Sequence, residues 1–515
     1  MDTLNKLCYT NPVTTIGHSG SDSCLTVHAG ISHSENGGHP MAIQVSLKKN
    51  FIMNMLLTAS SMIFPLITYP YISRILLPEG MGRVAFVTSV VSYFSMVSSL
   101  GIPTYGIRAC AQVRDSKEEL TRTVHEIFII NACMTLIVYL FFFLAVFFVK
   151  QLHQEKALFL ICGSTLFFNL IGMEWMYKAL EQYHYITIRS VFFKAVSVVL
   201  MLATIHSRSD YVLYGALTIL AGVGSNIFNF FHARKYISFR PGTKYNFRQH
   251  LTPILVFFAF SVATTIYTNL DTAMLGFFKG NIEVGYYNAA VKIKEILVAF
   301  VTALGTVMLP RISYYVKGGQ IREFTSLVKK AMDFVLFSAL PICVYFIFTA
   351  DNSILFLAGD SFYGAIRPMQ LIMPTLICIG ITNIIGIQIL VPLGKEKLVV
   401  LSTCAGAITD LILNALLIPE FAACGAALGT LSAEIIVLAV QLHFIRPVLP
   451  DLFEKVQYKK LLPALFLASC ALCAVKPLLH MGLFFSLVVT ALLFFSVYLL
   501  ALLLLKYQFP LKKPC

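Results

Sequence analysis

The chain is a succession of long apolar runs separated by short polar connections. From Phe51 onward, runs of about 20 residues recur with few charges inside them, and that is the length a helix needs to cross a bilayer. We therefore predict an all-α polytopic membrane protein with about 14 transmembrane helices. The spans are expected near residues 51–77, 84–107, 124–149, 157–177, 186–205, 211–231, 251–278, 284–309, 331–350, 367–393, 398–418, 422–444, 461–479 and 481–505.

Composition agrees with this pattern. Of the 515 residues, 57% are hydrophobic and 12% are charged, whereas a soluble domain is about 25% charged. The formal net charge of +14 suggests a polyanionic partner at first sight. However, alternate connections hold 28 lysines and arginines on one side of the expected membrane and eight on the other. By the positive-inside rule, the charge is a topology signal. It predicts cytoplasmic termini and no nucleic-acid partner.

An internal repeat divides the expected helices. Gly82 and Gly285 lie in similar small-residue turns, 203 residues apart, and transporters are often built from such repeats. We expect a first six-helix half at 48–231, a basic cytoplasmic linker at 232–250 and a second six-helix half at 251–445. Two additional helices and a short cytoplasmic tail follow at 446–515. Residues 1–47 are expected to be a disordered extension, or to lie ahead of the natural start of translation.

Several motifs recur along the same stretches. Residues 65–74 read PLITYPYISR, 78–82 read PEGMG and 100–108 read LGIPTYGIR. In the second half, 269–276 read NLDTAMLG and 284–293 read VGYYNAAVKI. Together they resemble the polysaccharide flippases of the Wzx type, within the superfamily that includes multidrug exporters and the lipid II flippase. Leu77 stands where that family usually has glycine.

This resemblance implies a MATE-like fold and a flippase for surface polysaccharide biosynthesis. The implied cargo is an undecaprenyl-diphosphate-linked oligosaccharide, moved to the outer face of the bacterial plasma membrane. The implied energy source is antiport with a cation, H⁺ or Na⁺, without another cofactor. Membrane lipid and a glycan polymerase are the other expected partners.

Arg74 is the sharpest candidate for substrate binding. A buried arginine is costly in a membrane and is rarely kept there without a partner. Its guanidinium could bind a phosphate bidentately in a central cavity. The alternative is that it snorkels toward the membrane surface.

Charged residues of the second half supply the other deep candidates. Lys292 is a candidate for substrate binding, although Glu295 three residues later could pair with it on the same helix face. Lys294 points about 200° away from Lys292, so we expect only one of them to line a cavity well. Asp271 is a candidate for cation coupling, or a structural counter-charge.

Arg108 and Arg311 close the inner ends of two expected spans. Such residues usually mark topology. They are also candidates for catching a phosphate at the cytoplasmic mouth of a cavity. Replacing Arg74 or Lys292 by alanine is predicted to abolish transport without preventing membrane insertion.

Two rival functions remain open. A multidrug exporter of the same fold would be expected to carry acidic residues in its cavity. A membrane polysaccharide polymerase is disfavoured because every connection on the outer side is short. No catalytic motif, nucleotide-binding loop or metal-ligand spacing is found, so we predict a transporter rather than an enzyme.

Overall fold

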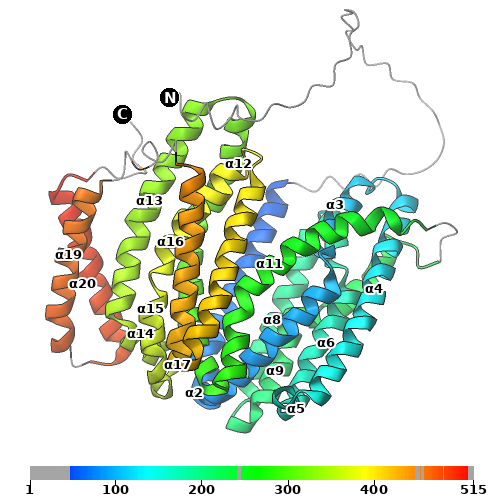
Figure 1. Ribbon diagram of the computed structural model, residues 1–515, viewed down its shortest axis with the longest axis horizontal. Helices are drawn as coiled ribbons and strands as arrows, with labels where there is room; N and C mark the ends of the chain where they lie inside the picture. The colour runs from blue at the N-terminus through cyan, green and yellow to red at the C-terminus, as the bar shows by residue number, and fades with distance from the viewer. Residues whose placement is uncertain (1–46, 241–244, 447–452, 454–456, 480, 508–515) are drawn as a thin grey trace, which may run out of the picture.

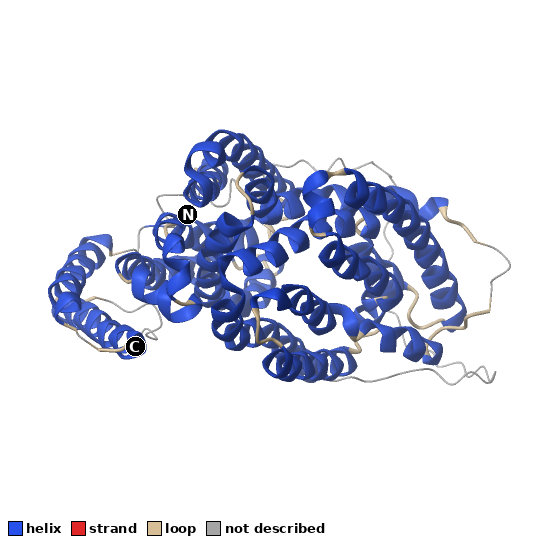
Figure 2. Cartoon of the chain, turned by 90° about the horizontal axis from the view of Figure 1, so that it is seen from below, coloured by secondary structure: helices blue, strands red, loops and turns tan. Residues whose placement is uncertain are grey.

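The protein is a bundle of helices. The structure, a computed structural model, describes residues 47–240, 245–446, 453, 457–479 and 481–507, and all regular structure within them is helical (Figures 1 and 2). The described helices of the first half are α2 (Leu47–Ser99), α3 (Ile102–Gln112), α4 (Lys117–Phe148), α5 (Lys150–Gln154), α6 (Lys156–Gly172), α7 (Glu174–Ala179), α8 (Tyr183–Thr204), α9 (Tyr211–Ile219) and α10 (Asn226–His232).

The second half has the same all-helical character. It contains α11 (Arg248–Phe278), α12 (Asn281–Lys317), α13 (Ile321–Phe348), α14 (Ala350–Ala358), α15 (Ile366–Ile372), α16 (Thr375–Asn383) and α17 (Glu396–Phe444). A π-helical segment, Ile384–Leu390, follows α16. The pair α19 (Tyr458–Val475) and α20 (Leu483–Leu504) lies at one edge of the molecule (Figure 1).

Two of these helices are hairpins. Helix α2 is interrupted at Leu77, whose φ of 60° and ψ of 177° are not helical, and it turns back on itself there (Figure 1). The following Pro78 disfavours the α conformation for Leu77. Helix α17 is interrupted in the same way at Ala422. The two breaks separate the expected spans 51–77 from 84–107, and 398–418 from 422–444.

Each expected span coincides with helical structure. Nine described helices are long and apolar enough to cross a membrane, or ten when the bent pair Asp360–Ile372 and Thr375–Leu390 counts as one span. These helices are consistent with 14 spans, because two of the nine are hairpins and α6 and α12 cover two further runs. The prediction of an all-α polytopic membrane protein is confirmed. The span 367–393 differs in shape, since its two parts meet at 46°.

The halves meet most closely at the two glycines that mark the repeat. A Cβ on Gly82 would stand 1.7 Å from the Asn281 carbonyl oxygen, and one on Gly285 would stand 2.1 Å from the Pro78 carbonyl oxygen. Glycine therefore allows the α2 turn to touch the start of α12 backbone to backbone. This contact closes the end of the bundle away from the start of α2. We call that the closed end, and the other the basic end.

Helix α11 crosses between the halves (Figure 1). At the basic end, Glu126 of α4 accepts a hydrogen bond from the Asn246 backbone N–H at 2.7 Å and contacts His250 Nε2 at 2.6 Å. The other ring nitrogen of His250 lies 2.6 Å from the Tyr105 hydroxyl of α3. Further along, α11 packs on α17 of the second half. The start of α11 is thus fastened to the first half.

The C-terminal pair is attached at the closed end. Lys476 Nζ lies 2.7 and 2.8 Å from the two carboxylate oxygens of Asp351, and it also donates to the Phe348 carbonyl at 2.7 Å. The boundaries predicted for the five segments stay a prediction. Most of the expected N-terminal extension, 1–46, lies outside the described residues, as do 241–244 of the linker and 508–515 of the tail.

Candidate functional site

A charged cavity of about 700 Å³ lies within the second half, against the first part of α2. Its charged lining residues come from α11, α12 and α17. They include three carboxylates and two ammonium groups, in addition to tyrosines and hydroxyls. The lining residues used below are Tyr267, Asp271, Tyr287, Lys292, Lys294, Glu295, Thr430 and Glu434.

Asp271 is the most fully engaged of these acids. Its side chain is buried, and one carboxylate oxygen accepts a hydrogen bond from Asn414 Nδ2 at 2.5 Å. The other accepts from the Thr430 hydroxyl at 2.8 Å and from the Tyr287 hydroxyl. Three donors from two other helices thus converge on one carboxylate. They can stabilise negative charge at a depth where water cannot.

A second carboxyl group lies against the first. Asp410 of α17 is 2% exposed and lies near enough to Asp271 for the two carboxyl groups to interact electrostatically. Two acceptor oxygens beside them, Asp410 Oδ1 and Asn414 Oδ1, are buried without a hydrogen-bond donor. Two neighbouring carboxylates repel each other unless one of them is protonated or a cation lies between them. The geometry therefore suits a proton or a hard monovalent cation with oxygen ligands. Among the described residues no group of three His, Cys, Asp or Glu side chains could hold a metal ion.

The two lysines of α12 both line the charged cavity. Lys292 forms the ion pair with Glu295 that its spacing allows, at 2.8 Å, and the pair is solvent-accessible. Lys294 lies within electrostatic range of Asp410 and Glu434. The expectation that the two lysines would not line one cavity equally stays a prediction, and so does substrate binding by Lys292. In the lining of this cavity the three carboxylates outnumber the two lysines.

Arg74 lies outside the lining of the charged cavity. Its guanidinium binds the carbonyls that end α14, including Phe356 at 2.6 Å and Leu357 at 3.5 Å. It also binds the Pro70 carbonyl of its own helix. A cation at a helix C-terminus satisfies unpaired carbonyls and the helix dipole. The structure therefore places Arg74 as a cap between the halves, and its binding of substrate stays a prediction.

The remaining two predicted residues lie at the basic end. Arg108 is exposed on α3, and Arg311 lines a separate groove with residues of α13. Of the five predicted residues, the structure thus brings together only Asp271 and Lys292. Substrate binding by Arg108 and Arg311 stays a prediction.

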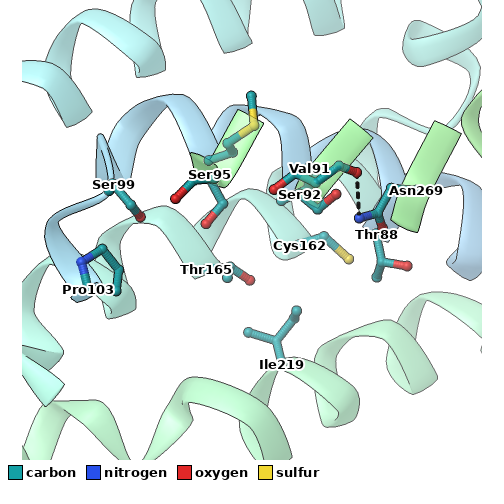
Figure 3. A pocket seen from close by; sticks show the side chains of 14 residues that line it. Thr88, Val91, Ser92, Ser95, Ser99, Pro103, Cys162, Thr165, Ile219 and Asn269 are labelled. Carbon is teal, nitrogen blue, oxygen red and sulfur yellow. Dashed lines mark hydrogen bonds between the residues drawn. The ribbon is translucent and has the colours of Figure 1, made fainter. Parts of the chain in front are cut away.

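A second cavity lies between the halves and is lined without a single charged side chain. It has a volume of about 410 Å³. We call it the hydroxyl cavity, and Figure 3 shows it from close by. Its lining residues are Thr88, Val91, Ser92, Ser95, Met96 and Ser99 of α2, Gly101 before α3, Pro103 of α3, Cys162 and Thr165 of α6, Ile219 of α9, and Ser261, Thr265 and Asn269 of α11.

The hydroxyl groups of this cavity fall into two sets. Those of Thr88, Ser92 and Ser261 donate to carbonyls of their own helices at 2.6–3.1 Å, as hydroxyls in membrane helices commonly do. Those of Ser95, Ser99, Thr165 and Thr265 donate to no acceptor among the described residues, and the buried Thr165 Oγ1 has no hydrogen-bond partner at all there. The hydroxyls of the second set are therefore available to donate hydrogen bonds to a ligand.

Sequence reasoning missed Asp410, Glu434 and the hydroxyl cavity. The two acids lie inside apolar runs, so the cost of an intramembrane carboxylate was a usable signal. The polar lining residues also follow a pattern. The hydroxyl residues 88, 92, 95 and 99 on α2 recur at helical spacing, and so do the hydroxyl residues 261 and 265 with Asn269 on α11. Only the fold shows that these two stripes face each other.

An all-helical bundle of two hairpin-containing halves, with an acid pair in one half and a polar seam between them, defines a transporter. A family model described as "Polysaccharide biosynthesis protein" matches residues 47–316. The chain belongs to this polysaccharide biosynthesis family.

Similar proteins agree with that assignment. A protein of Escherichia coli K12 named "Putative O-antigen transporter" is 22% identical over 405 residues, which cover 78% of this chain and 97% of that protein. The solved lipid II flippase MurJ, in an inward closed conformation, aligns with a TM-score of 0.67 at 17% identity, over 88% of this chain and 98% of its own. An inward-facing MATE multidrug resistance transporter aligns at 0.54 and 12% identity, over 81% and 97%.

These findings confirm two predictions. The structural neighbours show the MATE-like fold. The relatives are named as transporters, which supports a transporter rather than an enzyme.

Proposed function

We propose that this protein is a flippase that moves an undecaprenyl-diphosphate-linked oligosaccharide across the plasma membrane. The basic end would face the cytoplasm, in line with the charge asymmetry of the connections. The two halves would alternate between openings on either side. A glycan polymerase would consume the delivered units outside. The family and the names of its relatives support the class of cargo.

The hydroxyl cavity is the observation that carries this proposal. It lies on the seam between the halves, where an alternating transporter must expose its cargo to each side in turn. Its free hydroxyls can both donate to and accept from sugar hydroxyls. The absence of charge in its lining suits uncharged sugar residues, since an unpaired carboxylate there would lack a counter-charge.

The acid pair supplies a candidate for energy coupling. Asp271 and Asp410 would bind H⁺ or Na⁺ as a co-transported ion. The bound cation would neutralise their mutual repulsion, with Asn414 and Thr430 providing further oxygen atoms. Asp271 is part of α11, the helix that crosses between the halves. Binding and release of the ion could thus bias the position of that helix.

Depletion of the protein in its native cells tests the proposal. Completed lipid-linked oligosaccharide should accumulate on the cytoplasmic face, where an impermeant glycan-binding probe cannot reach it. If the units instead reach the outer face and remain unpolymerised, the protein is not their flippase, and the polymerase function is favoured.

The acids of the charged cavity support a second candidate, export of a cationic compound. Asp271, Glu295 and Glu434 outnumber the two lysines in its lining. Under this function, depletion would leave lipid-linked glycan unchanged and would sensitise cells to cationic drugs. The same depletion experiment therefore separates the two candidates.

A further inference from the structure

A basic groove lies at the basic end of α12 and α13, separate from both cavities. It encloses about 370 Å³ between Arg311 and Tyr315 of α12 and one face of α13. In Figure 1 the turn between these helices extends beyond the ends of their neighbours. The α13 face contributes Arg322, Glu323, Ser326, Leu327 and Lys330.

One side chain in the groove is held in a defined orientation. Arg311 Nε donates to the Tyr315 hydroxyl at 2.9 Å, and the guanidinium carbon lies 5.6 Å from the Tyr315 ring centre. The terminal guanidinium nitrogens form no hydrogen bond with the described residues. These two nitrogens are the pair that an arginine uses to bind phosphate bidentately.

The positive charges of the groove are not neutralised by nearby carboxylates. Arg311, Arg322 and Lys330 converge from two helices, and no carboxylate of the described residues lies within 4.0 Å of any of them. Glu323 is the single acid in the lining. Three cations around one hollow repel each other unless an anion lies between them. Cations that only mark topology need not converge in this way.

The position of the groove along the membrane normal indicates which kind of anion it binds. Arg311 follows the apolar run 284–309 by two residues, and Lys330 directly precedes the run 331–350. Both therefore lie where the hydrocarbon core gives way to the headgroup layer. Basic pockets between helices at this height on the cytoplasmic side bind phosphorylated headgroups.

We propose that the groove binds the phosphate group of a membrane lipid. Arg311 would form the bidentate contact, and Arg322 and Lys330 would neutralise the remaining charge. The phosphate could belong to an anionic phospholipid or to a prenyl diphosphate. In the second case alone the inference rests on the proposed function, because that lipid would be the cargo.

Binding measurements on the full-length protein test this. The protein is placed in nanodiscs of neutral phosphatidylcholine and titrated separately with phosphatidylglycerol and with undecaprenyl diphosphate, and bound lipid is counted by native mass spectrometry. The variant R311Q/R322Q/K330Q should weaken binding of at least one probe about tenfold or more, the change expected for about 1.4 kcal/mol. The control R234Q/K235Q/R240Q removes the same charge from exposed positions of the linker and should stay within about twofold.

Each outcome has a defined meaning. Loss of phosphatidylglycerol binding assigns the groove to phospholipid, and loss of undecaprenyl diphosphate binding alone assigns it to the cargo lipid. Wild-type binding of both probes by the triple variant overturns the proposal, and so does an equal loss in the control.

The single variants R311K and Y315F guard against misfolding of the triple variant. Both variants preserve the charge of the groove. R311K removes the guanidinium group, and Y315F removes the hydroxyl that orients it. Each should weaken binding about threefold, and unchanged binding in both would also overturn the proposal.

Discussion

The two cavities of this protein differ in both lining and position. The charged cavity is lined mainly by the second half, with the first part of α2 beside it, and contains three carboxylates and two lysines. The hydroxyl cavity is lined mainly by the first half, with α11 beside it, and contains no charge. The acids of the charged cavity have hydrogen-bond partners on several helices of the second half. These helices can keep their contacts with one another while the two halves move. The hydroxyls come from helices of both halves, so movement of the halves must change their spacing. Under the proposed function, the charged cavity would hold the co-transported ion and the hydroxyl cavity would hold the glycan.

The largest effect is expected for Asp271→Asn. An amide keeps one oxygen for the donors Asn414, Thr430 and Tyr287 but carries no negative charge, so it could not bind H⁺ or Na⁺ together with Asp410. Flipping of lipid-linked oligosaccharide in proteoliposomes should fall at least about tenfold, the equivalent of about 1.4 kcal/mol. Glu295→Gln is the matched control, since its carboxylate only pairs with exposed Lys292. Equal losses in both variants would contradict a specific ion site at Asp271.

A large effect on stability is expected for Gly82→Val. Its side chain would overlap the backbone at Asn281, so the contact at the closed end could not form. The thermal unfolding midpoint, followed by reaction of buried cysteines with a thiol dye, should fall by several degrees, as for other overpacked sites. Gly222→Val serves as control, because a Cβ on Gly222 would meet no atom within 4 Å. A similar midpoint for both variants would show that the halves do not need this contact.

A smaller and selective effect is expected for Thr165→Val. The change removes a buried hydroxyl without a partner among the described residues, so stability should be unchanged or slightly raised. Transport of a glycan-bearing lipid should fall about fivefold if one hydrogen bond of about 1 kcal/mol is lost.

Ser261→Ala is the comparison for that experiment, because the Ser261 hydroxyl already donates to the Phe257 carbonyl. It should lower transport less than Thr165→Val. The reverse order would argue that the hydroxyl cavity does not contact the glycan.

The smallest effect is expected for Arg74→Gln. As a cap on α14, Arg74 should contribute about 0.3–1 kcal/mol to stability, and transport by the folded protein should change little. Chemical unfolding and proteoliposome assays of the same preparation measure both quantities. Loss of transport with unchanged stability would instead support the prediction that Arg74 binds substrate.

Much of the architecture was predictable because a bilayer makes apolar length a direct signal of a spanning helix. The hairpin breaks also follow local chemistry, as at Leu77 before Pro78. The residues of the candidate site were harder to predict from the sequence. Asp271 was found because a carboxylate inside an apolar run is costly, and the same signal was present at Asp410 and Glu434.

What the sequence by itself determined is the class of protein: an all-helical membrane transporter with a repeat, whose Gly82 and Gly285 mark equivalent turns. The tertiary structure alone decided which side chains meet. It joined Asp271 to Asp410 across 139 residues of sequence, turned Arg74 onto the end of α14, and set the hydroxyl stripes of α2 and α11 face to face. Helical periodicity specifies the face on which a residue lies, but the partner of that face depends on packing between distant helices.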